Sequence, residues 1–268
     1  MTVVDTEIAN HVALVTLQRP HARNALDPEL IVALVATWEA LAADDEVRVI
    51  VLTGAEGTTF CSGFDLVTTI PLITGAREPA DEHEQAVVDD RGLLGRATLR
   101  DYDPGKPVIA AVNGHAIAGG MELMLAADLR VVATGVKLGL SEVALGLIPG
   151  MGGTARLGRH LPPAVALELL LTAKPMTSDD LAATGLINRL EPVERVVAVA
   201  QGLAATIAAN APLAVRAARS VVRASADLSE RDALALEEEQ GAILSATEDA
   251  REGPRAFLER RPPVFTGR

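Results

Sequence analysis

Two glutamates near the middle of the chain have the residue type and the surroundings for acid–base chemistry. Glu122 lies between Met121 and Leu123 in an apolar stretch that predicts a helix, and Glu142 follows Gly-Leu-Ser further along. Apolar surroundings raise the pKa of a carboxyl group toward the range that is useful for proton transfer. A lone glutamate is more often a solvated or helix-capping residue. The glycine-rich context of this pair points instead to catalysis.

Glycine-rich turns near the glutamates predict backbone N–H donors for an anion. Residues 118–120, Ala-Gly-Gly, follow a predicted buried strand and open a helix, and the N-terminus of a helix favours negative charge. Upstream, a predicted strand over 47–53 leads to 60–65, Phe-Cys-Ser-Gly-Phe-Asp, where a glycine again lets the backbone come close to a ligand. Two such donors aimed at one oxygen form an oxyanion hole.

Several motifs, taken together, resemble those of the crotonase superfamily, and most closely those of enoyl-CoA hydratases. They stand in the family's order and at its usual spacings, and with the helical C-terminal part they cover nearly the whole chain: 16–20 with 24–26, 60–65, 113–116 with 119–123, 138–142, and 148–154. The resemblance implies an α/β fold, a spiral of repeated ββα units followed by a C-terminal helical region. Two strand-and-helix blocks are visible in the sequence, but periodicity alone does not predict the spiral.

The resemblance also implies an activity, which is the addition of water across the 2,3 double bond of a trans-2-enoyl-CoA thioester. It implies that Glu122 is the base toward water, that Glu142 is the proton donor, and that the N–H groups of Phe64 and Gly119 form the oxyanion hole. Coupled carboxylates titrate as a pair, so neither is given a pKa of its own. The substrate- or CoA-binding positions implied by the resemblance are Arg23, Ser62, Gly63, Asp65, Leu66, Gly120, Phe257 and Arg260.

The presence of both carboxylates favours hydration over the other reactions of the superfamily. Relatives that isomerise a double bond, or that hydrolyse or dehalogenate a thioester, often keep the oxyanion hole but replace one or both glutamates. A hydratase or dehydratase of a polar acyl-CoA of the carnitinyl type, or an enoyl-CoA isomerase, stays open as an alternative. The intact pair disfavours a non-catalytic binding protein. Two residues depart from the family pattern, Ala118 in place of a third glycine and Ser141 in place of a common proline.

Composition narrows the possible partners. The chain has 268 residues, 49% of them hydrophobic, and a formal net charge of −12. Its length suits one large domain or a domain with an appendage, and the charge disfavours nucleic acid and anionic membranes. It contains no run of 18 apolar residues, and the N-terminal residues lack the features of a secretion signal, so we expect no membrane span and a cytoplasmic protein.

Other chemistries fit the sequence less well. Residues 150–155 match a dinucleotide-binding G-x-G-x-x-A pattern, but the run before them ends in a proline rather than a clean strand. Ser141 lacks the closing glycine of a nucleophile elbow. Cys61, the only cysteine, is expected to be a buried structural residue, and His115 a structural histidine. The five scattered histidines predict no metal site, and the only cofactor expected is the coenzyme A of the substrate itself.

The predicted elements divide the chain near residue 193. Residues 1–192 are expected to form the spiral core with the active site, and 193–268 a helical region that makes the protein a homo-oligomer. The family resemblance implies trimers paired into hexamers. A charged stretch over 71–100 is expected to act as a lid, with helix only from about residue 87. The other predicted elements are a hairpin over 3–8 and 12–17, strands over 108–112, 129–132, 137–140 and 186–190, and helices over 28–43, 119–127, 163–171, 178–184, 194–209, 212–224, 229–250 and 253–260.

Overall fold

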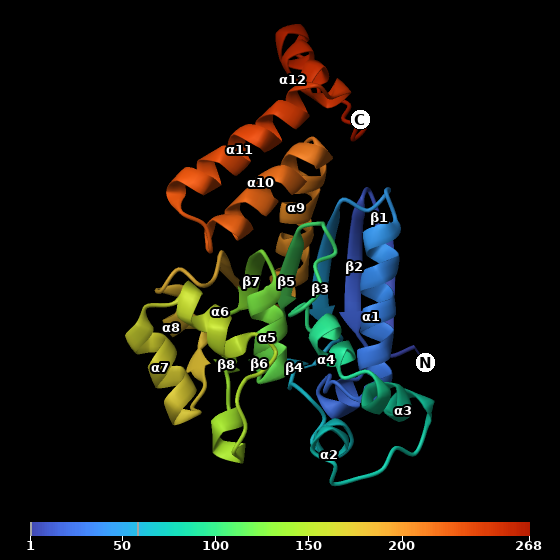
Figure 1. Ribbon diagram of the computed structural model, residues 1–268, viewed down its shortest axis with the longest axis vertical. Coiled ribbons are helices and arrows are strands. Elements are labelled where there is room, and N and C mark those ends of the chain that lie inside the picture. The colour runs from blue at the N-terminus through green and yellow to red at the C-terminus, as the bar shows by residue number, and fades with distance from the viewer. Residues whose placement is uncertain (1, 58) are drawn as a thin grey trace.

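Two β-sheets and the helices around them form the fold (Figure 1). The computed structural model describes residues 2–57 and 59–268, so Met1 and Thr58, which fall within the predicted core range, lie outside the described residues. The larger sheet has the strand order β1-β2-β3-β5-β7-β10 and the smaller one β4-β6-β8-β9. The strands are β1 Val4–Ala9, β2 Val12–Leu17, β3 Val49–Gly54, β4 Thr59–Cys61, β5 Val108–Val112, β6 His115–Ile117, β7 Leu129–Ala133, β8 Lys137–Gly139, β9 Met176–Thr177 and β10 Arg189–Glu191.

Successive strand pairs wind through both sheets. β3, β5 and β7 are parallel neighbours in the larger sheet, while β4, β6 and β8, which follow them in the chain, are parallel neighbours in the smaller one. Each turn therefore adds one strand to each sheet before a helical segment leads to the next turn. This confirms the expected α/β spiral, and β1 pairs with β2 as the predicted antiparallel hairpin.

The helices either cover the larger sheet or extend beyond it. They are α1 Pro28–Ala43, α2 Thr69–Thr74, α3 Glu82–Asp89, α4 Gly92–Ala97, α5 Gly119–Ala126, α6 Gly153–His160, α7 Pro163–Thr172, α8 Ser178–Ala182, α9 Val196–Ala208, α10 Pro212–Ser225, α11 Glu230–Ser245 and α12 Glu248–Glu259, with 3-10 turns η1 Pro20–Ala22, η2 Glu142–Leu145 and η3 Val193–Arg195.

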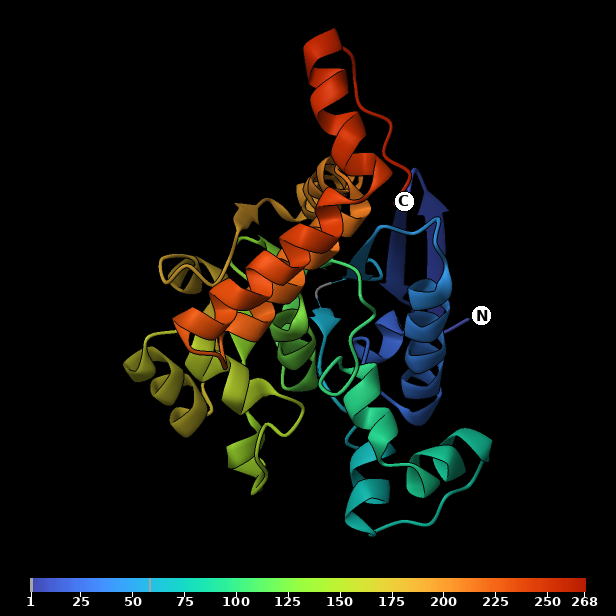
Figure 2. The same ribbon diagram turned by 45° about the horizontal axis from the view of Figure 1, so that its top comes forward.

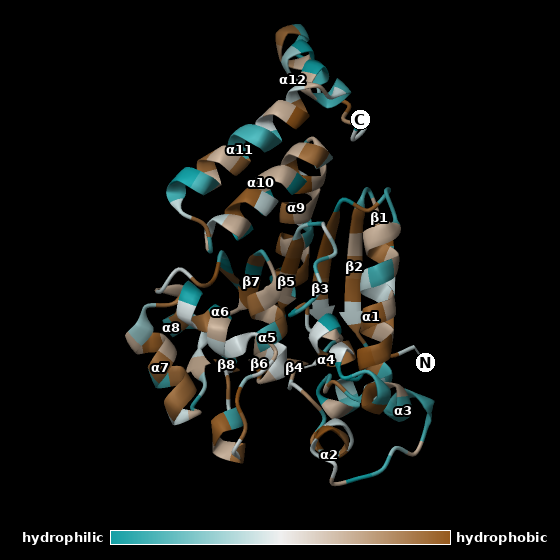
Figure 3. Ribbon diagram, viewed as in Figure 1, coloured by the Kyte–Doolittle hydropathy of each residue, from teal (hydrophilic) through white to brown (hydrophobic). Residues whose placement is uncertain are grey.

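The core lies between the larger sheet and the helices packed on it. α1 begins as predicted, because the carboxylate of Asp27 accepts a hydrogen bond from the Leu30 N–H at its first turn. Trp38 of α1 is fully buried and donates its indole N–H to the carbonyl of Ala97 at 3.0 Å. α9 places Ala200 and other small residues against the sheet, whose strands are apolar along most of their length (Figure 3).

The stretch predicted to be a lid is more ordered than its charge suggested. α3 begins at Glu82, not near residue 87, because Asp81 caps it and the buried Glu84 pairs with Arg77. Leu72 and Val87 are both buried. The segment is therefore packed and more helical than predicted, and its role as a lid stays a prediction.

The C-terminal helices differ from the prediction in one place. The helix predicted over 229–250 is two helices, because Thr247 accepts the N–H of Ala250 and starts α12 at Glu248, five residues before the predicted helix at 253. α10, α11 and α12 extend beyond the sheet, as two views show (Figures 1 and 2). α9 packs on the sheet itself, and the division at residue 193 stays a prediction.

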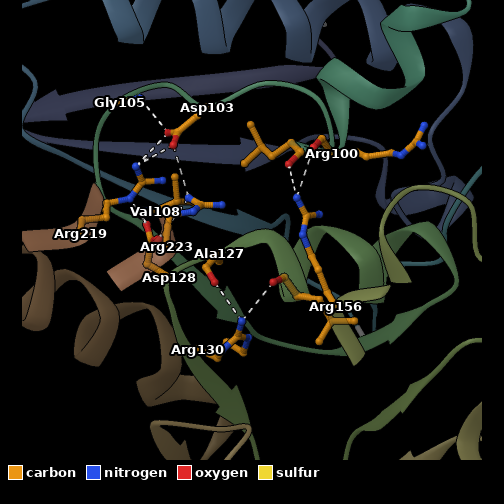
Figure 4. Close-up of polar contacts among 12 residues, drawn as sticks. Arg100, Asp103, Gly105, Val108, Ala127, Asp128, Arg130, Arg156, Arg219 and Arg223 are labelled. Atoms are coloured by element: carbon orange, nitrogen blue, oxygen red, sulfur yellow. Dashed lines mark hydrogen bonds and ion pairs between the residues drawn. The ribbon is translucent and has the colours of Figure 1, made fainter. Parts of the chain in front are cut away.

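Ion pairs connect α10 to the core. Arg219 donates to the carboxylates of Asp128, at 2.8 Å, and Asp103, at 2.9 Å, and Arg223 approaches the same two acids (Figure 4). Within the described part of the chain, no single helix is long and apolar enough to cross a membrane. The segment of η3 and α9 reaches the required length and hydropathy only when it is joined to α10, and the two are bent by 108° relative to each other.

Candidate active site

Glu122 is held at the N-terminus of another helix. It lies in the first turn of α5, is 1% exposed, and its Oε1 accepts the N–H groups of Met151 at 2.7 Å and Gly153 at 2.8 Å. Those donors lie at the start of α6, where the helix dipole also favours a negative charge. A Cβ on Gly153 would come within 2.8 Å of that oxygen, so only glycine permits this approach.

Opposing effects act on the ionisation of Glu122. Burial raises its pKa, and the hydrogen bonds from Gly153 and Met151 lower it, as do the charges of Arg156 and Arg100. Burial outweighs these effects, so the pKa of Glu122 lies above its ordinary value, although the backbone donors and the positive charges reduce the rise.

Glu142 lies within electrostatic reach of Glu122 but has a different environment. It is the first residue of η2, and its Oε2 is buried with no hydrogen-bond partner among the residues that the structure describes. Burial, and then the charge of Glu122, raise the pKa of Glu142 to about 7. Burial therefore raises the pKa of both carboxyl groups, and Glu122 differs in being held by the backbone donors at the start of α6.

The two predicted oxyanion donors are brought together by two glycines. A Cβ on Gly63 would lie 2.8 Å from the nitrogen of Gly119, so the segments that carry Phe64 and Gly119 are in contact. The carbonyl of Leu26 accepts the N–H of Asp65, and the N–H of Leu26 donates to the carbonyl of Gly63. The N–H groups of Phe64 and Gly119 have no protein acceptor in 2–57 and 59–268. Both remain available to a ligand oxygen.

The glycines of this turn also set how closely its backbones pack. A Cβ on Gly120 would lie 2.1 Å from the carbonyl oxygen of Cys61, which excludes any side chain there. Ala118 has φ 51° and ψ −125°, a conformation that non-glycine residues rarely adopt. The backbone geometry thus gives a physical reason for glycine at the position where this chain has alanine.

The other residues predicted near the oxyanion hole lie beside it, with different contacts. The carbonyl of Arg23 accepts the N–H of Ser62 at 3.1 Å, which places Arg23 next to the Gly63 turn. Asp65 uses one carboxylate oxygen to cap the N–H groups of Val67 and Thr68, and its other oxygen faces Arg19. Leu66 is 62% exposed and free to contact a ligand.

Phe257 and Arg260 are not brought to this site within one chain. Both belong to the end of α12, which lies at the far end of the molecule from α5 (Figures 1 and 2). Phe257 is 82% exposed, and Arg260 ends the helix with a φ of 54°.

The remaining reactive side chains have structural roles. Cys61 is fully buried, and burial raises the pKa of its thiol to about 12, so it stays protonated and unreactive. The Nδ1 atom of His115 accepts the N–H of Lys137 at 2.9 Å, which joins β6 to β8. Across 2–57 and 59–268, no group of three or more His, Cys, Asp or Glu residues could hold a metal ion.

Comparison with known proteins identifies the family. The model of the enoyl-CoA hydratase/isomerase family matches residues 7–268. The chain belongs to this family. It is 36% identical over 264 residues to an (E)-benzylidenesuccinyl-CoA hydratase of Thauera aromatica, which covers 98% of this chain and 99% of that protein. It is also 36% identical over 261 residues to a carnitinyl-CoA dehydratase of Proteus mirabilis (strain HI4320), with 95% and 94% covered.

The fold comparison agrees with this assignment. The crystal structure of an enoyl-CoA hydratase from Mycobacterium tuberculosis H37Rv superimposes with a TM-score of 0.89 at 36% identity, and the match covers 100% of both chains. The chain is therefore an enoyl-CoA hydratase/isomerase family member in fold as well as in sequence, and an enzyme of the crotonase superfamily.

Some of the residues that surround Glu122 were not predicted from the sequence. The backbone donors of Met151 and Gly153, and the side chain of Arg156 behind them, were not predicted to contact or influence Glu122. The glycine run over 150–153 was the available signal, since it precedes the helix α6. From the sequence, this run is interpreted as a family motif and as a possible dinucleotide-binding pattern, but no donor to Glu122 is predicted from it.

Proposed function

We propose that this protein is an enoyl-CoA hydratase that adds water to a trans-2-enoyl-CoA thioester with Glu122 as base and Glu142 as acid. The observation that carries the proposal is the contrast within the pair. Glu122 accepts two backbone N–H groups at a helix N-terminus, whereas Glu142 has a buried oxygen without a partner among the described residues and a pKa raised to about 7. The proposed base is thus the carboxyl group whose ionised form is bound by backbone donors, and the proposed acid is the one with a buried oxygen that lacks a donor.

The proposed reaction uses each group once. Glu122 takes a proton from water, and the resulting hydroxyl bonds to C3 of the substrate while the electrons of the double bond move onto the thioester oxygen. The N–H groups of Phe64 and Gly119 stabilise that oxygen as negative charge builds on it, a contribution of about 2.7–4 kcal/mol for each donor in comparable sites. Glu142 then gives its proton to C2. Water is added across the bond, and both carboxyl groups return to their starting states by exchange of one proton.

Exposed apolar residues on either side of the glutamates support an acyl substrate. Leu66 and Val67 follow the Phe64 donor, and Leu145 and Ile148 follow Glu142, each with more than half of its surface exposed, between 58% and 78%. Where exposed apolar residues gather into a patch, they mark a binding site. Such surroundings suit the hydrocarbon part of an enoyl thioester.

A panel of purified enoyl-CoA esters tests the proposal. The esters vary in chain length and polarity, and hydration is followed by the loss of the conjugated-thioester absorbance, without added metal or nicotinamide. We expect at least one trans-2-enoyl ester to be hydrated. If none is, while a thioester is hydrolysed or a 3-enoyl ester is isomerised, the hydratase proposal is wrong.

The same panel decides between apolar and polar acyl chains. The relative from Proteus mirabilis is named for the dehydration of carnitinyl-CoA, and it is as similar to this chain as the hydratase relative is, at 36% identity. Dehydration is the reverse of the proposed reaction and needs the same pair of carboxyl groups. A carnitinyl-CoA arm, read by the appearance of the conjugated thioester, identifies that substrate if it reacts faster than the apolar esters.

The proposal extends to assembly and location. α10 and α11 carry apolar residues such as Val222, 71% exposed, and Ile243, 57% exposed, which supports a homo-oligomer built through these helices as trimers or paired trimers. Phe257 and Arg260 would then contact the CoA nucleotide bound to another copy. A cytoplasmic location, expected from the sequence, is part of the same proposal.

A further inference from the structure

Arg156 lies behind the loop that holds Glu122. It belongs to α6, and its guanidinium folds back over the start of that helix, where a Cβ on Gly152 would be 2.7 Å from its Nη1. Gly152 has a φ of 98°, and it immediately precedes Gly153, one of the two donors to Glu122. The arginine therefore packs directly on the turn that presents those donors.

The same guanidinium also connects this turn to a second segment. Its Nη2 donates to the carbonyl of Leu99 at 2.7 Å and, at 3.5 Å, to that of Arg100 (Figure 4). Leu99 is 3% exposed and has a positive φ of 54°, so the carbonyl is presented by a buried, unusual turn after α4. One planar side chain thus fixes the distance between the α6 turn and the α4 turn.

Part of the charge of Arg156 has no partner in the protein. Its Nη1 is buried and makes no hydrogen bond within the described residues. A buried donor on a charged group is costly to leave unpaired, so its retention calls for an explanation. The charge of Arg156 interacts with two carboxylates, Glu122 and Asp101, and of these Glu122 is the one that accepts the backbone donors of the turn beneath Arg156.

We propose that Arg156 is a positioning residue for Glu122, which holds the Met151–Gly153 turn in place and brings a positive charge near this carboxyl group. This inference rests on the proposed function of Glu122 as base. The other charged groups that act on Glu122 are Glu142 from η2, which disfavours its charge, and Arg100 after α4, which favours it. Arg156 differs from Arg100 in touching the donor turn itself.

Substitution of Arg156 tests the charge and the fork separately. Arg156→Met keeps much of the apolar stem and removes the charge, so the acid limb of the pH profile of kcat/KM is expected to move up by about one unit, with KM nearly unchanged. Arg156→Lys keeps a charge but has no planar fork, so its acid limb is expected near that of the wild type while kcat falls. Arg159→Met is the matched control, because Arg159 lies on the same helix but pairs with Asp227 at the surface.

Two further measurements separate this role from general stability. In a Glu122→Gln background, Arg156→Met is expected to add little further loss of kcat, since residues that act as a unit are not additive. A full additional loss in the double variant overturns the proposal, as does an unchanged acid limb in folded Arg156→Met. Should Arg156→Met fail to fold, Arg156→Lys decides, and wild-type kcat in that variant overturns the positioning role.

A titration that needs no substrate keeps this inference distinct from the proposed function. The side-chain carboxyl carbon of Glu122, assigned by its loss in Glu122→Gln, is followed by NMR against pH in the wild type and in the folded Arg156 variant that lacks the charge. A higher titration midpoint in the variant supports the proposal even if the wild type hydrates none of the esters. An unchanged midpoint overturns it even if the wild type is an active hydratase.

Discussion

At the residue scale, the two glutamates are alike in chemistry and unlike in environment. Glu122 is held by the backbone donors of a helix terminus, whereas Glu142 is partly buried and its Oε2 has no hydrogen-bond partner within the described residues. The proposed division into acid and base therefore depends on environment rather than residue type, as expected when desolvation and hydrogen bonding compete.

Replacing either glutamate by glutamine tests this pair. Glu122→Gln and Glu142→Gln are nearly isosteric, so the fold is expected to persist while kcat falls by roughly 10²–10⁴-fold, the usual contribution of an acid–base group. The double variant is expected to be little slower than the slower single variant, because the two residues act as a unit. Steady-state kinetics checks this, with circular dichroism as the control for folding. Near-normal turnover in a single variant removes that residue from the mechanism.

The raised pKa of Glu142 predicts an alkaline limit to activity. Hydration requires this group to be protonated, and its pKa is about 7 in the free protein, so kcat/KM is expected to fall with rising pH above about 7. Bound substrate excludes more water and raises that pKa further, so the limb in kcat is expected at higher pH than the limb in kcat/KM. Rates of the wild type across pH, with buffer and salt held constant, measure both. A kcat/KM that stays constant well above pH 7 contradicts the assignment of Glu142 as acid.

At the scale of single elements, the entry to α5 combines function with strain. The turn between β6 and α5 leaves the N–H of Gly119, a proposed oxyanion donor, without a protein acceptor among the described residues, and Ala118 in this turn adopts a backbone conformation suited to glycine. Such strained residues cost about 1–3 kcal/mol each and persist where the surrounding packing imposes them.

Ala118→Gly is therefore expected to stabilise the protein. The relief of strain exceeds the extra flexibility of glycine in the unfolded chain, so the free energy of unfolding is expected to rise by about 1 kcal/mol. Denaturant unfolding measures this change. Ala126→Gly, at the other end of α5 and in ordinary helix, is the matched control and is expected to lower the free energy of unfolding by about 1 kcal/mol or more. A loss of stability in Ala118→Gly would mean that the turn carries no strain.

At the scale of the whole molecule, α9 differs from the helices that follow it in both composition and packing. It contains no charged residue and lies on the sheet with Val196 and Ala204 fully buried, whereas α10, α11 and α12 carry many charged residues. α10, α11 and α12 extend outward, connected to the core by Arg219 and by Arg48, which donates to the carbonyl of Phe265.

A truncation after Asn210 tests what these three helices do. It keeps α9 on the sheet and removes α10 to α12, so the remaining core is expected to fold but not to assemble, and to bind CoA more weakly. Sedimentation of the full chain and of the truncated chain measures assembly, and titration with CoA measures binding. A full chain that is active as a monomer, or a truncated chain that assembles normally, contradicts the proposed role of the C-terminal helices.

The sequence by itself determined many of the local elements and the candidate site residues, because these depend on neighbours in the chain. The cap at Asp27, the buried strand β5 and the glycine turn before Glu122 all follow from short-range patterns. Recognition of the spiral needed the family resemblance, since its two sheets are joined by pairings between distant strands.

Only the tertiary structure decided how the glutamates differ. The donors to Glu122 come from residues 29 and 31 positions away, and Arg156 reaches Leu99 across 57 positions, distances over which periodicity carries no information. The early start of α3 likewise depends on Glu84 becoming buried against Arg77, a contact that turns a charged, apparently solvated stretch into part of the packed structure. Burial and long-range contacts, which set these pKa values and helix ends, exist only once the chain has folded.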